Sequence, residues 1–184
     1  MDIRHWKERL ETARREKDQF FASHPQSPLS PQDRRVFQGL DYWPPDADYR
    51  FELQLHEHDE GKTIRVADTS GEQRNLWRWG EFCFKVSGKE CTLQVYKSDP
   101  DEERLFAPFR DQTSGKETYG AGRYIDLEPA RHLTSQGNWV VDFNEAYNPW
   151  CAYSEDYACP FVPPENWLRV PIRAGEKKYP LGEK

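Results

Sequence analysis

The feature that most constrains the fold is a change of hydrophobic period at Asp48. From Tyr49 onwards, apolar residues recur at every second position in short runs, and turn residues interrupt the runs at 59–62, 68–72 and 87–90. This alternation is typical of strands with one buried face. The expected strands cover residues 49–58, 63–67, 74–79, 82–86, 91–95, 105–109, 123–127, 139–143 and 168–172. Short strands joined by tight turns predict a mainly β fold, an antiparallel meander that closes into a barrel or sandwich.

An amphipathic helix is predicted before the strands, over residues 2–22. Ile3, Trp6 and Leu10 belong to an apolar stripe that repeats at three- and four-residue steps, and Asp2 suits the N-cap. Because the stripe is narrow, we expect the helix to pack outside a sheet. Pro25 ends it, since the residue before a proline avoids helical backbone angles.

The remaining organisation is simple. A proline-punctuated connector spans residues 25–46, with Pro31 at the first position of a short helix. A β domain is expected over residues 48–173, and it includes an ordered loop at 144–166. A chain of 184 residues is most simply one domain, here 1–184.

Charge and composition bear on the class of partner. The net charge of −6 argues against nucleic acid, which basic surfaces bind. No apolar run approaches the ~20 residues of a membrane helix, and the charged N-terminus lacks the apolar region of a secretory signal. Four cysteines are too few for a disulfide scaffold. We therefore expect a soluble cytoplasmic protein with reduced thiols and no nucleic-acid or membrane partner, in an oligomeric state that the sequence leaves open.

The segment 142–176 is where we expect a site. It holds Cys151, Cys159, repeated prolines and many aromatic residues. Prolines remove backbone donors, which suits neither a long helix nor a regular sheet. The large apolar side chains suit a packed, ordered loop instead. Long ordered loops often carry functional sites.

Metal and cofactor signals are weak. His56 and His58 would point to one face of a strand, as metal ligands must. The alternation puts them on the polar face with Arg50, however, and no third ligand follows at a convincing spacing. The glycine-rich run 111–122 lacks the spacing of a phosphate-binding P-loop. The sequence predicts no metal and no cofactor.

The cysteines fall into two pairs. Cys83 and Cys91 are expected on opposite faces of a hairpin, where a disulfide cannot form. Cys151 and Cys159 have the wrong spacing for zinc, and no histidine follows His132. Packing is the favoured role of this second pair. A redox pair or labile disulfide, a nucleophile and a metal ligand remain as alternatives.

Arg123 and Asp142 are the most suggestive charged residues. Both lie in apolar strand contexts, where a charge must be paired or hydrogen-bonded. Asn144 shares the face of Asp142 by the two-residue period. Two interpretations remain open: a structural ion pair between Arg123 and Asp142, or a ligand-binding arginine that the carboxylate orients.

Three long motifs carry a family resemblance: FRDQTSGKETYGAGRYID, VVDFNEAYNPWCAYSEDYACP and PPENWLRVPIRAGEK. Together they resemble the bacterial and archaeal domain-of-unknown-function family 1684, and the likeness extends over essentially the whole chain. The resemblance implies no activity. It implies a signature made of Tyr119, Arg123, Asp142, Asn144, Tyr147, Asn148, Cys151, Cys159, Asn166 and Glu176.

Three functions follow as hypotheses. The first is a barrel-mouth pocket for a small polar or anionic ligand, around Arg123 and Asp142 and under the 144–166 loop. Its other expected ligand-binding residues are Tyr119, Asn144, Tyr147, Asn148 and Asn166. The second is a hydrolase with Asp142 or Glu145 as general base, or Cys151 as nucleophile. The third is a non-catalytic interaction module without a pocket, in which Arg123 and Asp142 are paired and dry.

Overall fold

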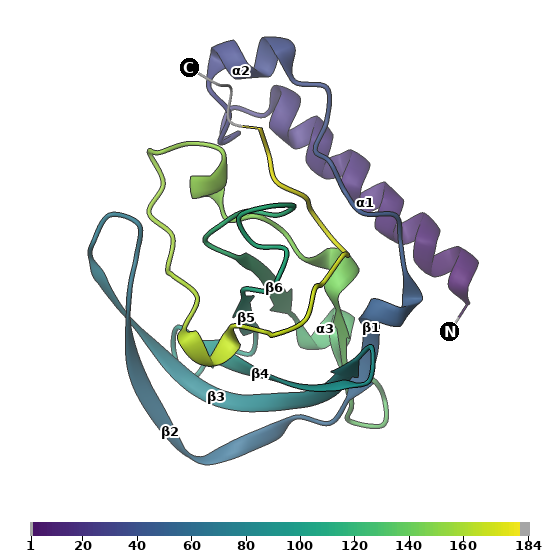
Figure 1. Ribbon diagram of the computed structural model, residues 1–184, viewed down its shortest axis with the longest axis vertical. Helices are drawn as coiled ribbons and strands as arrows, with labels where there is room; N and C mark the ends of the chain where they lie inside the picture. The colour runs from purple at the N-terminus through teal and green to yellow at the C-terminus, as the bar shows by residue number, and fades with distance from the viewer. Residues whose placement is uncertain (1, 181–184) are drawn as a thin grey trace.

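The computed structural model describes residues 2–180, without the side chain of residue 60, and shows a mainly antiparallel β protein with an N-terminal helix (Figure 1). A five-stranded sheet has the order β2-β3-β4-β5-β6, and β1 pairs with β7. The strands are β1 Arg50–Leu53, β2 His56–Ala67, β3 Gln73–Val86, β4 Lys89–Lys97, β5 Leu105–Phe109, β6 Arg123–Leu127 and β7 Trp139–Asp142. The mainly β, antiparallel prediction is confirmed. The barrel is not, because the five-stranded order is open and β1 and β7 form a separate pair.

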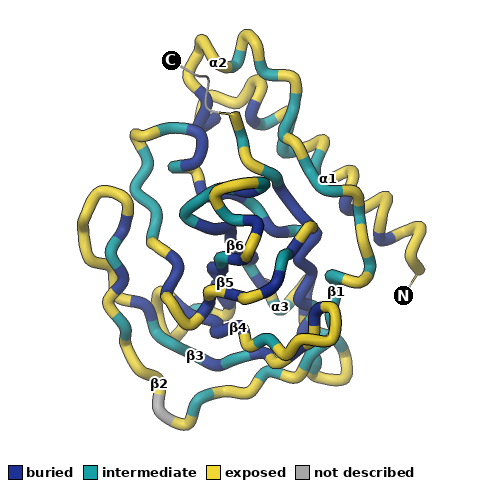
Figure 2. The backbone as a smooth tube through the Cα atoms, viewed as in Figure 1, coloured by how far each residue is buried: buried dark blue, intermediate teal, exposed yellow. Residues whose placement is uncertain are grey.

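Helix α1, Ile3–Ser23, lies along one side of the molecule, away from the curved sheet (Figure 1). Asp2 caps it by accepting hydrogen bonds from the backbone of residues 4 and 5. Trp6, Leu10 and Phe21 are buried, as the apolar stripe predicts, while the outer face of the helix is exposed (Figure 2). The other helical elements are short: α2 Pro31–Val36, α3 Pro129–His132 and four 3₁₀ turns at Ala47–Tyr49, Phe143–Glu145, Trp150–Ala152 and Pro164–Asn166.

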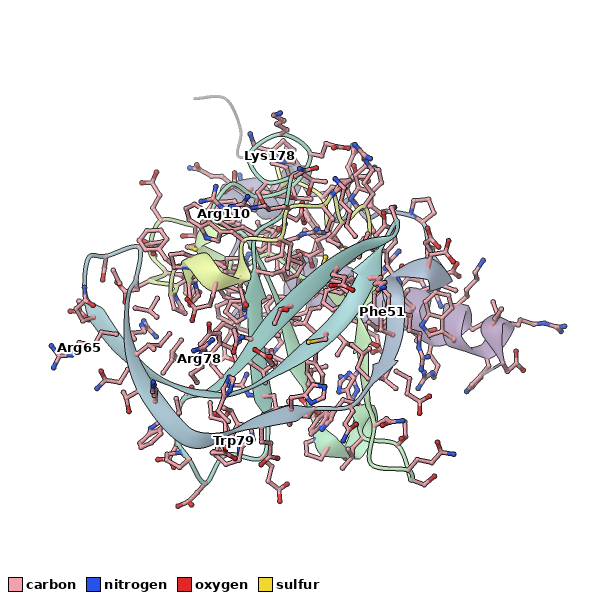
Figure 3. The ribbon with its side chains drawn as sticks, turned by 60° about the horizontal axis from the view of Figure 1, so that its bottom comes forward. Phe51, Arg65, Arg78, Trp79, Arg110 and Lys178 are labelled. Carbon is pink, nitrogen blue, oxygen red and sulfur yellow. The ribbon has the colours of Figure 1, made fainter. Side chains whose placement is uncertain are left out.

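The expected strand boundaries between 49 and 86 are partly wrong. The run at 49–58 divides, because β1 pairs with β7 whereas β2 pairs with β3. The turn expected at 59–62 is an irregularity inside β2. β3 likewise continues through Arg78 and Trp79, which are labelled in Figure 3, and its pairing with β4 shifts register at a bulge between Arg78 and Gly80. Gly80 follows this bulge, and a Cβ there would lie 2.6 Å from the carbonyl oxygen of His56.

The later strands agree better with the sequence. The bounds of β5 and β6 match the expected 105–109 and 123–127. The strand expected at 168–172 is absent from the described residues, and a single bridge joins Arg110 to Trp167 there instead. Residues beyond β7 pack through 3₁₀ turns and isolated bridges. Single-domain organisation stays a prediction, and residues 1 and 181–184 of its expected span lie outside the described residues.

The core is rich in aromatic residues. Phe51 on β1 packs on Phe84 of β3, with ring centroids 5.0 Å apart, and Phe143 contacts Phe84 and Phe109 at 5.5 and 5.1 Å. This cluster joins the two sheets, with Phe84, Phe109 and Phe143 buried and Phe51 partly buried. Among residues 2–180, no helix combines the length and apolarity needed to cross a membrane.

Candidate functional site

A cavity of about 450 Å³ lies between α1 and the chain that follows β7. Its helical wall consists of Trp6, Arg9, Leu10, Ala13, Arg14 and Lys17. The opposite wall includes Tyr42, Asp126, Glu128, Asn144, Glu145, Tyr147 and Glu176. Asn144, Glu145 and Tyr147 are therefore the predicted site residues that this cavity brings together. The helical residues were missed, although Ala13, Arg14 and Lys17 continue the three- and four-residue steps of the buried stripe.

Arg14 lies in the helical wall and is fixed there by its guanidinium group. Its Nη1 donates to the carbonyl of Trp43 at 2.9 Å, and its Nη2 donates to the carbonyl of Asn144 at 3.2 Å. The guanidinium carbon lies 4.5 Å from the ring centroid of Tyr42. The Nε atom is buried and has no hydrogen-bond partner among residues 2–180. Burial lowers the pKa of Arg14, yet a guanidinium stays protonated at neutral pH.

Glu176 connects the C-terminal segment to the rest of the cavity wall. Its carboxylate is buried and pairs with Lys17. It also accepts hydrogen bonds from the Tyr153 hydroxyl at 2.5 Å and the Asn148 backbone at 2.8 Å. Burial and the Glu176 charge together raise the pKa of Tyr153 well above its ordinary value. A carboxylate with this many donors serves to hold segments together.

Asp142 holds α1 against the β1–β7 pair. It accepts a hydrogen bond from the indole Nε1 of Trp6 at 2.7 Å, and two from Asn144 at 2.9 and 2.8 Å. Arg50 lies 3.6 Å away. Burial raises the pKa of Asp142 despite these hydrogen bonds. Asn144 also exchanges hydrogen bonds with the backbone of Asp46, so it joins the connector to this cluster.

The expected pairing of Arg123 with Asp142 is wrong. Arg123 lies opposite Phe109 in the β5–β6 register, and this places its guanidinium beside Asp111 rather than Asp142. The Nη2 atom donates to Asp111 at 2.7 Å and to the carbonyl of Ile172 at 2.7 Å. Nη1 donates to two further carbonyls, at residues 174 and 176. With 1 % of its side chain exposed, Arg123 braces the C-terminal segment and lies outside the cavity.

Several other predicted ligand-binding residues hold backbone segments. Asn166 accepts from the backbone N–H of Gln94 and donates to the carbonyls of Gln94 and Pro108, so it connects β4 to β5. Asn148 donates to the carbonyl of residue 177 at 2.8 Å. Tyr119 lines a separate cavity of about 280 Å³, together with Cys151. The predicted set is therefore divided among two cavities and the interior, and its ligand-binding role stays a prediction.

Glu145 and His132 form a pair at the edge of the first cavity. His132 Nε2 lies 3.0 Å from the Glu145 carboxylate, and Arg131 lies 3.8 Å from it. Burial favours a higher pKa for Glu145, but the His132 hydrogen bond and the charges of His132, Arg131 and Arg9 outweigh it and lower the pKa. A general base at neutral pH needs the opposite shift. His132 has no local sequence signal, because its partner lies thirteen residues further along the chain.

The chain is similar to proteins that carry no assigned function. The family model described as "Protein of unknown function (DUF1684)" matches residues 35–177. The solution NMR structure of an uncharacterized protein from Haloarcula marismortui, a structural genomics target, is 38 % identical. The likeness covers 98 % of this chain and 97 % of that one, with a TM-score of 0.74. None of the curated proteins compared with the chain matches it. Helix α1 lies outside the family-model match but within the structural likeness.

Proposed function

We propose that this chain, which belongs to the DUF1684 family of proteins of unknown function, binds a small ligand with a carboxylate or phosphate group in the cavity between α1 and residues 144–147. The observation that carries the proposal is the cavity of about 450 Å³ itself, whose helical wall places the cations Arg9 and Arg14 beside the apolar Trp6 and Leu10. The side chain of Arg14 is fixed in this wall by hydrogen bonds to two backbone carbonyls. A ligand carboxylate or phosphate in the cavity gains charge-assisted interactions with these two cations.

The cations of the helical wall support an anionic group, although the opposite wall holds the acidic residues Asp126, Glu128, Glu145 and Glu176. Asp126 and Glu145 already accept hydrogen bonds from Tyr147 and His132 at 2.6 and 3.0 Å, so each is partly satisfied. Arg14 donates to two carbonyls, which are neutral acceptors, and no carboxylate forms an ion pair with it among residues 2–180, although Asp142, Glu11 and Glu176 act on its charge from further away. Arg9 adds a second cation from the same helix.

The shape of the cavity limits the size of the ligand. A volume of about 450 Å³ falls within the range of small-molecule sites. Trp6, Leu10 and Tyr147 supply apolar surface for a carbon skeleton, and Ala13 leaves the centre of the helical wall open. Glu128 is exposed on the opposite wall and suits a ligand hydroxyl or ammonium group. A small hydroxylated or amino acid fits this combination.

This site differs from the pocket expected around Arg123 and Asp142, and it weighs against the alternatives. The interaction-module hypothesis expected no pocket and a dry pair of Arg123 with Asp142. The hydrolase hypothesis relied on Asp142, Glu145 or Cys151. Asp142 is occupied by Trp6 and Asn144, and the pKa of Glu145 is lowered by its neighbours.

The test is a thermal-shift titration with inorganic phosphate, citrate, and a panel of hydroxy and amino acids. A ligand at about 100 times its Kd is expected to raise the Tm of the wild type by roughly 5–10 °C. Ala13→Leu fills the cavity and is expected to abolish the shift. Ala22→Leu is the matched control, because Ala22 is exposed on α1 away from the cavity. A panel in which no compound raises the wild-type Tm, or an equal shift in Ala13→Leu, would overturn the proposal.

A further inference from the structure

Cys151 and Cys159 meet at one point of the fold. The backbone N–H of Cys151 donates to the Cys159 Sγ across 3.4 Å, and the Tyr119 hydroxyl donates to the Cys151 Sγ across 3.7 Å. Both residues are half-buried free cysteines. The Cys159 backbone is fixed by two hydrogen bonds with Thr69, each 3.1 Å long. One thiol therefore belongs to a segment anchored beside β2, and the other to the 3₁₀ turn Trp150–Ala152.

Cys151 is accessible to a small molecule, and Cys159 is partly exposed beside it. Cys151 lines the cavity of about 280 Å³ described above, with Thr69, Ser70, Tyr119 and Tyr157. The cavity is large enough for a peroxide. Its acidic members, Glu155 and Asp156, disfavour anionic reactants but leave a neutral one unaffected.

The two thiols differ in their tendency to ionise. A hydrogen bond from the Cys151 thiol lowers the pKa of Cys159 to about 6, against the opposing effect of burial. The Cys151 backbone N–H and the Arg74 charge act in the same direction. The same hydrogen bond and burial raise the pKa of Cys151. Such an arrangement, a thiolate beside a protonated thiol, is found in cysteine pairs that react with oxidants.

We propose that Cys151 and Cys159 form a peroxide-responsive dithiol that oxidises reversibly to a disulfide. The Cys159 thiolate attacks one oxygen of hydrogen peroxide, the O–O bond breaks, and a sulfenic acid forms as hydroxide leaves. The Cys151 sulfur then attacks the Cys159 sulfur, forming the S–S bond and breaking the S–O bond. The departing hydroxide takes the proton of the Cys151 thiol. The proton released when the Cys159 thiol ionised neutralises the first hydroxide, so in total two thiols lose two electrons and one peroxide becomes two waters.

The disulfide connects the 3₁₀ turn at 150–152 to the segment beside β2. It closes a loop that contains Tyr153, whose hydroxyl contacts Glu176 at 2.5 Å. The proposal is independent of the ligand site, because none of its steps uses the cavity beside α1.

The test uses the full chain, in which Cys83 and Cys91 serve as internal controls. The protein is treated with about one equivalent of hydrogen peroxide, denatured, alkylated and mapped by mass spectrometry. A Cys151–Cys159 crosslink that dithiothreitol reverses is expected, while exposed Cys83 and half-buried Cys91 remain alkylated. Before oxidation, Cys159 is expected to react with iodoacetamide at pH 7 roughly tenfold faster than Cys83.

Two variants separate the steps. Cys151→Ser is expected to leave Cys159 as a sulfenic acid that dimedone traps, and Cys159→Ser is expected to form no crosslink and no adduct at residue 151. Oxidation of Cys83 before Cys159 in the wild type would overturn the proposal. So would a wild type whose Cys151 and Cys159 both stay fully alkylatable after peroxide treatment.

Discussion

The indole Nε1 of Trp6 donates a 2.7 Å hydrogen bond to the carboxylate of Asp142, although the two residues are 136 positions apart in the sequence. Trp6 lies near the start of α1, and Asp142 ends β7. This contact fixes the helix against the strand pair β1–β7. The helical wall of the candidate ligand cavity is therefore positioned by a residue from the other end of the chain.

Loss of this hydrogen bond is expected to destabilise the fold. Trp6→Phe keeps an aromatic ring but leaves one oxygen of the buried carboxylate without its donor, at a cost of ~1–3 kcal/mol. Urea unfolding measures the change. Trp150→Phe is the control, since Trp150 is an exposed tryptophan and its replacement is expected to change the free energy of unfolding by less than ~0.5 kcal/mol. Equal effects of the two changes would contradict the role given to Asp142.

The Arg123–Asp111 pair is expected to be strongly coupled. Arg123→Met leaves the fully buried Asp111 carboxylate unpaired, at a cost of ~3–5 kcal/mol. Asp111→Asn is expected to relieve part of that loss when it is combined with Arg123→Met. Arg123→Met combined with Asp142→Asn is expected to be additive, because the two residues share no contact. Chemical denaturation of the single and double variants gives both coupling energies, and coupling to Asp142 alone would contradict the described geometry.

Gly175 is expected to tolerate no side chain. Its φ is +76°, and a Cβ would lie 2.5 Å from the carbonyl oxygen of Ala146. Gly71 has a φ of +89° but nothing within 4 Å of the added atom. Gly71→Ala therefore measures the backbone strain alone, ~1 kcal/mol, and Gly175→Ala is expected to cost at least ~1–3 kcal/mol more through overpacking. The difference in Tm between the two variants tests this close approach.

The stability contributed by Glu145 is expected to depend on pH. Its folded-state pKa lies below its ordinary value, so the ionised form is favoured in the folded protein. That stabilisation is present above the ordinary pKa of ~4.3 and is lost as pH falls through the lower folded value. Glu145→Gln is therefore expected to destabilise the protein by roughly 0.5–1 kcal/mol at pH 7, allowing for solvent screening, and by less below pH 4. Urea titrations at the two pH values measure the change in the free energy of unfolding that Glu145→Gln causes. A larger destabilisation in acid than at pH 7 would contradict a lowered pKa of Glu145.

Two exposed arginines of α1 offer a charge test of ligand binding. Arg9 lines the cavity and Arg15 does not, although both are exposed on the same helix. Arg9→Gln is expected to weaken the ligand identified in the thermal-shift panel by about 5–10-fold, because it removes one cation from the site. Arg15→Gln is expected to leave the Kd unchanged. Isothermal titration calorimetry measures the Kd of both variants. Equal losses of affinity would indicate a general effect of charge and would contradict a site beside Arg9.

Local sequence pattern predicts elements that bury their own apolar faces. The bounds of β5 and β6 agree with the expected strands, and α1 begins and ends within one residue of its predicted bounds, 2–22. The division at residues 54–55 coincides with the end of the alternation, since residues 56–62 hold no apolar side chain. The change of pairing partner, from β7 to β3, has no such local signal.

The candidate site was harder to predict from the sequence than the strands and the helix. Burial of Arg123 was expected from its apolar neighbours, but its partner depends on the antiparallel register of β5 and β6. The cavity beside α1 arises where a helix from the first residues meets the chain near residues 126, 145 and 176. The three- and four-residue steps place Arg14 on the same side of α1 as Leu10, but no local spacing shows which distant residues it faces.

The position of Glu176 has a consequence for the order of folding. Its carboxylate pairs with Lys17 of α1 and Tyr153, and the carbonyls at 172, 174 and 176 surround Arg123 of β6. During synthesis, residue 17 is made 159 residues before Glu176, and residue 123 is made 49 to 53 residues before the carbonyls that surround it. We therefore expect the nascent chain to hold α1 only loosely against the sheet until residue 176 emerges. Docking of residues 172–176 is then expected to complete the packing, at the slow rate typical of contacts distant in sequence.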